Sequence, residues 1–396
     1  MSEYTDSQAN GRAKGQANGQ AGGPTADRGL ASLRRRLVET GSVVVRETVV
    51  FGKCSWSYGV AVAASLAFIV AGLPLPWLLG PLALALVMST AGRPLPYVRW
   101  LMLPLRSLLG VAIGASFSPD LMSKAWGTML SLALMIPYTL LITGLGMLLL
   151  AKAARFDLPT AFFSAAPGGL ADMLIFAQDA GADLRRVSLI QAARVVSILC
   201  VLPFWLQYVA GLPLGGAAPQ ALHIWQIGLI DAATIVLIAW TGWWIAGMLG
   251  MSGGSIVGPL ILSAVLHVAS VTTVKVPVEV LILTQISVGL AVGAQFKGIS
   301  LREFATILSW GFVFGMGLVL IAGGMAVMVA SLTGLDATAL LLSYAPGGQN
   351  EMAIIALILG IDVAVIALHH LLRVVMVIVG AQVVFRMAKS WRAKGR

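Results

Sequence analysis

The chain of 396 residues is 58% hydrophobic and only 11% charged, and its mean hydropathy is +0.91, whereas soluble domains carry about 25% charged residues. These values exclude a soluble globular protein and predict an all-α protein that crosses a membrane several times, because each span needs about 20 mostly apolar residues. The net charge is +10, but the sequence has no nucleic-acid-binding motif. We therefore expect the lipid bilayer, and no nucleic acid, as a partner.

The two ends of the chain are basic. Residues 1–54 contain eight Lys/Arg and are rich in Gly, Ala, Ser, Asn and Gln, a composition that predicts a disordered arm. Residues 387–396 form a basic tail. The positive-inside rule places both ends in the cytoplasm, and we therefore expect a multi-pass protein of the bacterial cytoplasmic (inner) membrane.

Twelve apolar segments lie between these ends, in two sets of six. The first set predicts a membrane repeat over residues 55–210, and the second predicts another over 224–386, joined by a neutral linker at 211–223. The expected segments are 57–73, 77–91, 100–117, 127–151, 160–178 and 187–210, followed by 224–250, 254–270, 280–297, 305–331, 339–358 and 362–386.

The two sets are copies of one another. The 31-residue blocks that begin APGGLADM at Ala166 and APGGQNEM at Ala345 share 13 identical residues in order, at an offset of 179. Earlier in each set, a Gly-Pro pair recurs at an offset of 178. General hydrophobicity does not produce such ordered identity, so the sequence predicts an internal duplication.

Charges around the APGG blocks predict that the copies are inverted. Four Lys/Arg flank the first block, whereas none occurs between Arg302 and Arg373 around the second, so the flanks are expected on opposite sides of the membrane. Inversion needs an odd number of crossings per half. Either the broken segment is re-entrant and each half has five spans, or it crosses and the short segment at 77–91, with its mate, does not.

Each APGG block predicts a broken helix. Proline removes a backbone donor, glycine admits dihedral angles that other residues avoid, and the backbone groups released inside a membrane are tolerated only next to a cavity or buried protein. Paired breaks of this kind indicate the binding site of a transporter. The candidate backbone site consists of Pro167, Gly168, Gly169, Pro346, Gly347, Gly348 and the side chain of Asn350.

Asp172 and Glu351 follow the two breaks at matched positions. They are candidates for binding a coupling ion, since ionisable residues within membranes are usually functional, and capping of the new helix is the alternative. Arg194, Arg373 and His370 lie on the next segment of each half. The arginines either snorkel, form a structural ion pair, balance charge at the site or bind an anionic substrate. His370 shares a helix face with Arg373 and either carries protons or only forms a hydrogen bond.

With these motifs, the chain resembles the duplicated AbrB-type bacterial membrane proteins, through LLGPL and IVGPL, LLGVAIGASF and VGLAVGAQF, and both APGG blocks. Members of that family are often labelled as regulators of gene expression or as ammonia monooxygenases. The APGGLADM block is also similar to the crossover segment of the bile-acid:sodium symporter and cation:proton antiporter group. That resemblance implies inverted halves, discontinuous helices and ion coupling.

The residues and the resemblance together favour a secondary transporter of a small solute, coupled to H⁺ or Na⁺. A membrane sensor that affects gene expression without net transport is the alternative hypothesis. We expect no enzyme and no cofactor or metal, because no cluster of His and carboxylate ligands suits a monooxygenase. A homo-oligomer is compatible with the sequence.

Overall fold

The computed structural model describes residues 54–117, 124–214, 222–251 and 253–394, without the side chains of 170–172, 301 and 381–394. Every regular element in these residues is a helix, which confirms an all-α protein. Six helices are long and apolar enough to cross a membrane, so the protein is a multi-pass membrane protein. They cover Ala125–Lys152, Leu184–Tyr208, Leu229–Met248, Val278–Phe296, Arg302–Thr333 and Val363–Gly380.

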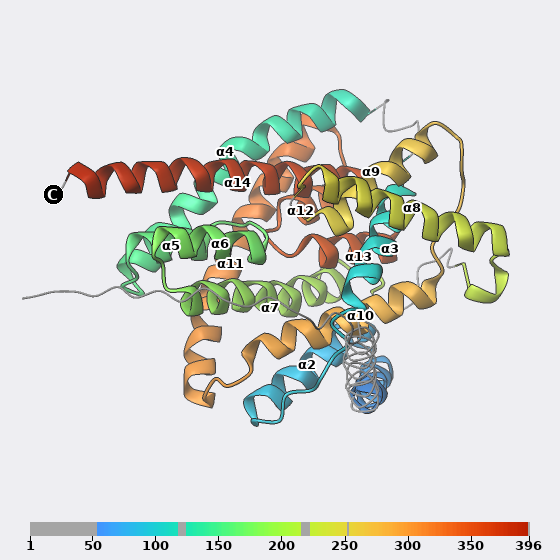
Figure 1. Cartoon of the computed structure of the whole chain (residues 1–396), viewed down its shortest axis with the longest axis horizontal. Coiled ribbons are helices and arrows are strands. Elements are labelled where there is room, and N and C mark those ends of the chain that lie inside the picture. Colours follow the sequence, from blue (N-terminus) through green and yellow to red (C-terminus); the bar gives the residue numbers. More distant parts are fainter. Residues whose placement is uncertain (1–53, 118–123, 215–221, 252, 395–396) are drawn as a thin grey trace, which may run out of the picture. The chain divides into compact units, whose positions relative to one another are not determined.

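The helices occur in the same order in both halves (Figure 1). In the first half, a helix over Cys54–Val70 precedes α2 (Pro76–Thr90), α3 (Met102–Gly114), α4 (Ala125–Lys152), α5 (Leu158–Ala165), α6 (Leu170–Ala180) and α7 (Leu184–Tyr208). In the second half, the helices are α8 (Leu229–Met248), α9 (Gly254–Val268), α10 (Val278–Gly293), α11 (Leu301–Thr333), α12 (Ala337–Tyr344), α13 (Gln349–Leu359) and α14 (Val363–Lys394).

Several corresponding helices have equal lengths. Helices α2 and α9 have 15 residues each, α5 and α12 have eight, and α6 and α13 have eleven. The helix starts reflect equivalent residues, since Asp157 and Asp336 cap α5 and α12 through their carboxylates, a favoured N-cap interaction. Glycines at 181 and 360 end α6 and α13 with φ of 73° and 65°, a conformation that favours glycine.

Glycines hold α3 against α9 and α10 against α2. A Cβ atom at Gly114 would lie 2.5 Å from the carbonyl oxygen of Leu260 on α9. A Cβ atom at Gly289 would lie 2.6 Å from the carbonyl oxygen of Leu78 on α2. Small residues therefore let the backbones approach closely, as in other membrane helix pairs.

Many of the remaining contacts also occur in pairs. Helix α7 contacts α11 while its counterpart α14 contacts α4, and α5 contacts α7 while α12 contacts α14. Figure 1 shows α6 between α7 and α14, and it contacts both. The bounds of the two repeats and their inverted orientation in the membrane stay predictions, and the basic arm up to residue 53, residues 215–221 of the linker and the last two residues of the tail lie outside the described residues.

Candidate functional site

The candidate site is built around two helix breaks with the same backbone geometry. Helix α5 ends at Ala165 and α12 ends at Tyr344, and the next residue has φ/ψ of −59°/125° in the first half and −58°/125° in the second. These angles follow from the proline that comes next, because proline moves the preceding residue out of the α region. New helices, α6 and α13, begin three residues after each proline.

The glycines of the breaks have ordinary dihedral angles, and two of them lie close to neighbouring side chains. None of the four has a positive φ, so the expectation that they adopt conformations closed to other residues is wrong. A Cβ atom at Gly168 would lie 2.9 Å from Val377 Cγ1 of α14, and one at Gly347 would lie 2.8 Å from Met352 Cε and 3.5 Å from Ile198 Cγ2 of α7. Each break is thus packed against the last helix of the opposite half.

Two buried arginines bind the backbone carbonyls released at the breaks. Arg194 Nη1 donates to the carbonyls of Ala165 and Ala166 at 3.4 and 3.3 Å. Arg373 Nη1 donates to Ala345 O at 2.8 Å, and its Nη2 donates to Gly347 O at 3.2 Å. Both arginines are only 3% exposed, so neither of them snorkels, and no described carboxylate forms an ion pair with either. They cap the negative ends of α5 and α12.

A second pair of side chains supports the same helix ends. Gln191 Nε2 donates to Phe163 O at 2.7 Å, and His370 Nε2 lies 3.1 Å from Leu342 O. His370 Nδ1 lies 2.6 Å from Arg373 Nη2. Because a guanidinium group only donates, Nδ1 accepts this bond and the His370 proton lies on Nε2, where it binds the carbonyl. His370 therefore orients Arg373 and caps α12.

Glu351 lies in the first turn of α13 and is 6% exposed. Its carboxylate folds back over the backbone of Gly348, where any Cβ atom would collide with Oε2. The carboxylate interacts electrostatically with Arg106 of α3, although the two form no ion pair within 4.0 Å. Glu351 thus combines a position at the helix start with a buried carboxylate that has no direct cationic partner in the described part of the chain.

The polar side chains beside Glu351 have unused hydrogen-bonding capacity. Gln349 Nε2 and Asn350 Oδ1 are buried and without a partner among the described atoms, and both follow directly on the second break. The equivalents of Gln349 and Asn350 in the first half are Leu170 and Ala171. The equivalent of Glu351 is Asp172, which lies in α6 but whose side chain lies outside the described residues. Unpaired buried polar atoms are uncommon in folded proteins, and a ligand, an ion or water can pair them.

A buried network that the sequence did not predict lies beside the second break. Ser131 Oγ lies 2.7 Å from His369 Nε2, Tyr344 Oη donates to Ser131 O at 2.7 Å, and Tyr138 Oη donates to Tyr344 O at 2.7 Å. His369 Nδ1 lies 2.7 Å from Val365 O and must donate to it, so Nε2 accepts from Ser131. The network ties α4 to α12 and α14. In the sequence, this network is indicated only by two polar residues, Ser131 and His369, within otherwise apolar segments.

The two halves differ at the matching place. The equivalents of Ser131 and His369 in the other half are Trp310 and Ile190, which form no such hydrogen bond. Near the network, Lys124 Nζ forms an ion pair with Asp362 Oδ2 at 3.0 Å. The equivalents of these two residues are both acidic, Glu303 and Asp183, which cannot pair directly and bind arginines instead.

No group of three or more His, Cys, Asp and Glu in the described residues could hold a metal ion. The polar groups at the breaks are instead backbone carbonyls, guanidinium groups, amides and one carboxylate. This set can bind a polar or charged solute and a small cation, the latter through Glu351 and carbonyl oxygens.

Comparisons with known proteins place this architecture in a family. Residues 77–389 match the family described as transition state regulatory protein AbrB. The chain is 26% identical over 352 residues to "Uncharacterized protein YhjN" of Bacillus subtilis (strain 168), a match that covers 82% of this chain and 90% of that protein. It is 25% identical over 340 residues to "Putative regulator AbrB" of Escherichia coli (strain K12), covering 83% and 94%. Since the family match spans most of the chain, the protein belongs to the AbrB family.

Proposed function

We propose that the protein is a secondary transporter of a small solute in the bacterial cytoplasmic membrane, coupled to H⁺ or Na⁺. The two helix breaks would form the site, and the two halves of the duplication, inverted in the membrane, would provide alternating access to it. Both termini would face the cytoplasm, as the charge distribution favours.

The observation that carries this proposal is the polar start of α13. Glu351 is buried without a direct cationic partner, and Gln349 Nε2 and Asn350 Oδ1 beside it are buried without hydrogen bonds. An unsatisfied buried polar group costs about 1–3 kcal/mol, a cost that a bound solute and ion would remove. Carboxylates inside membrane proteins generally mark ion or proton pathways, so Glu351 and its counterpart Asp172 are assigned to the coupling ion.

The arginines favour a solute that carries an anionic group. Arg194 and Arg373 repel each other electrostatically, and their Nε atoms are buried without a hydrogen-bond partner. A phosphate or carboxylate group bound beside either arginine would offset its buried charge and accept from its unpaired Nε–H. The backbone of Pro167, Gly168, Gly169, Pro346, Gly347 and Gly348 would line the same place.

Transport by protein reconstituted into liposomes tests the proposal. Uptake of a solute, found by comparing metabolites of cells with and without the gene, should depend on a H⁺ or Na⁺ gradient. The double variant Asp172→Asn, Glu351→Gln should lose the gradient dependence. If a verified uptake activity is unchanged in this variant, the coupling assignment is wrong.

The name of the Escherichia coli relative favours a second candidate function, a membrane sensor or regulator without net transport. In that case the site would bind a ligand and the basic arm would signal in the cytoplasm. Deletion of residues 1–40 separates the two functions. Uptake that survives the deletion supports transport, whereas loss of a gene-expression phenotype with normal membrane insertion supports signalling.

A further inference from the structure

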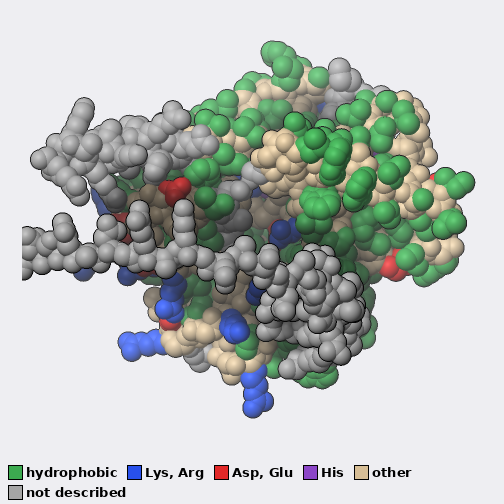
Figure 2. Space-filling view, in the orientation of Figure 1, with side chains coloured by type: hydrophobic (Ala, Val, Ile, Leu, Met, Phe, Trp, Pro, Cys, Tyr) green, Lys and Arg blue, Asp and Glu red, His purple; other side chains and the backbone are tan. Residues whose placement is uncertain are grey.

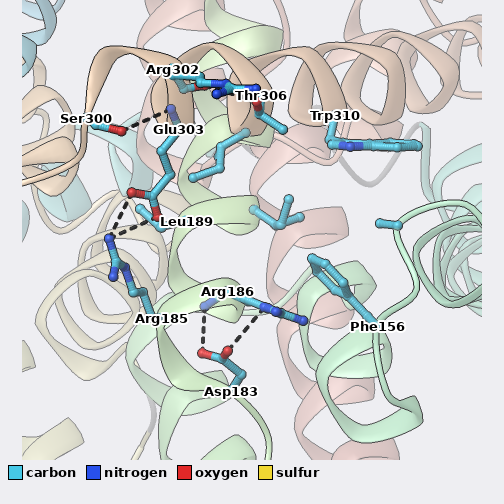
Figure 3. A pocket seen from close by; sticks show the side chains of 13 residues that line it. Phe156, Asp183, Arg185, Arg186, Leu189, Ser300, Arg302, Glu303, Thr306 and Trp310 are labelled. Carbon is cyan, nitrogen blue, oxygen red and sulfur yellow. Dashed lines mark hydrogen bonds and ion pairs between the residues drawn. The ribbon is translucent and has the colours of Figure 1, made fainter.

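A cavity of about 690 Å³ lies between α7 and α11, and none of its lining residues belongs to the two helix breaks. Figure 3 shows its lining, with charged residues at the starts of both helices, Trp310 farther along α11 and Phe156 from the segment between α4 and α5. Figure 2 shows Lys and Arg side chains gathered in the region where α7 and α11 begin in Figure 1. The charge distribution places this region on the cytoplasmic side.

The charges of the cavity leave one arginine available. Arg185 Nη2 pairs with Glu303 Oε1 at 2.9 Å, and Arg186 Nε pairs with Asp183 Oδ2 at 3.2 Å (Figure 3). Arg302 also lines the cavity, but it has no ion pair or side-chain hydrogen bond among the described residues. Three guanidinium groups and two carboxylates leave a net charge of +1.

The far part of the cavity is apolar. Arg302, Thr306 and Trp310 follow one another at intervals of four residues on α11, so they share one face of the helix. Leu189 and Ile190 of α7 line the same cavity. A molecule placed here would contact a cation at one end and an indole ring with aliphatic side chains at the other.

We propose that this cavity binds an amphiphilic anion, whose phosphate or carboxylate head contacts Arg302 and whose apolar body contacts Trp310. The guanidinium group offers two parallel N–H donors to the head, and Thr306 offers a hydroxyl group between the two ends. A free organic anion and an anionic phospholipid have this same chemistry. The site is separate from the breaks and does not depend on the proposed transport.

Calorimetric titration of the full-length protein in uncharged maltoside micelles tests this proposal, with phenyl phosphate as the probe. Binding should be saturable. Arg302→Gln should weaken it about tenfold, the effect of one charge-assisted hydrogen bond, and Trp310→Ala should weaken phenyl phosphate more than inorganic phosphate. Arg302 has no described partner to lose, so its variant should keep the unfolding temperature of the parent.

Arg99→Gln is the control, because Arg99 is exposed and is not part of the cavity lining, and it should bind like the parent. Added phosphatidylglycerol distinguishes the two sources of the anion. If phosphatidylglycerol competes with phenyl phosphate, and Arg302→Gln abolishes this competition, the site binds lipid. If phosphatidylglycerol leaves phenyl phosphate binding undiminished, the site binds a free solute. The proposal would be overturned if neither phenyl phosphate nor phosphatidylglycerol showed saturable binding. It would also be overturned if Arg302→Gln and Arg99→Gln weakened phenyl phosphate binding equally.

Discussion

Replacement of Arg373 by Met should destabilise the protein more than the same replacement of Arg194. Arg373→Met leaves two buried carbonyls at the second break without their donors, at about 1–3 kcal/mol for each, or about 2–6 kcal/mol in total. Arg194→Met removes the same buried charge, but its bonds are longer, at 3.3 and 3.4 Å. Both variants remove one buried charge, and Arg373→Met also removes the donor to His370 Nδ1. The difference between the variants therefore reports on the hydrogen bonds of Arg373 to the carbonyls and to His370.

The free energy of unfolding can be measured by SDS titration of each variant in mixed micelles, followed by circular dichroism. We expect Arg373→Met to lose at least about 1 kcal/mol more than Arg194→Met, since its shortest carbonyl bond is 2.8 Å and short bonds to charged donors are the stronger ones. Arg373→Lys should restore only part of the loss, because an ammonium group lacks the planar fork that reaches two carbonyls. A loss in Arg194→Met equal to or larger than that in Arg373→Met would refute the capping argument.

Three further outcomes are expected. Glu351→Gln should abolish the gradient dependence of uptake while the protein stays folded, as gel filtration and uptake assays can show. Gly293→Val should destabilise the α10–α2 contact by about 1–3 kcal/mol, whereas Gly323→Val, with open space around its Cβ position, should change the unfolding midpoint little. A cysteine at Ile307 of the cavity should react with a water-soluble maleimide, and a cysteine at its buried equivalent, Thr128, should not; equal labelling would contradict the difference between the halves.

Local sequence predicted the helix breaks well because their causes are local. Pro167 and Pro346 set the conformation of the residue before them. Because the surrounding sequence repeats at a fixed offset, a break in one half predicts a break at the matching position of the other half. The role of the neighbouring glycines was predicted incorrectly. Their dihedral angles are ordinary, and what distinguishes them is the closeness of the side chains of Val377 and Met352, 2.9 and 2.8 Å from where a Cβ atom would lie.

The sequence by itself determined the membrane class, the order of the helices and the two breaks, since hydropathy and the restrictions of proline act within one segment. Only the tertiary structure decided what surrounds them. Arg373 reaches carbonyls 26 and 28 residues away, and Ser131 meets His369 across 238 residues. Such contacts, like the cavity between α7 and α11, arise from how distant helices pack, and the periodicity of a single helix carries no information about its neighbour.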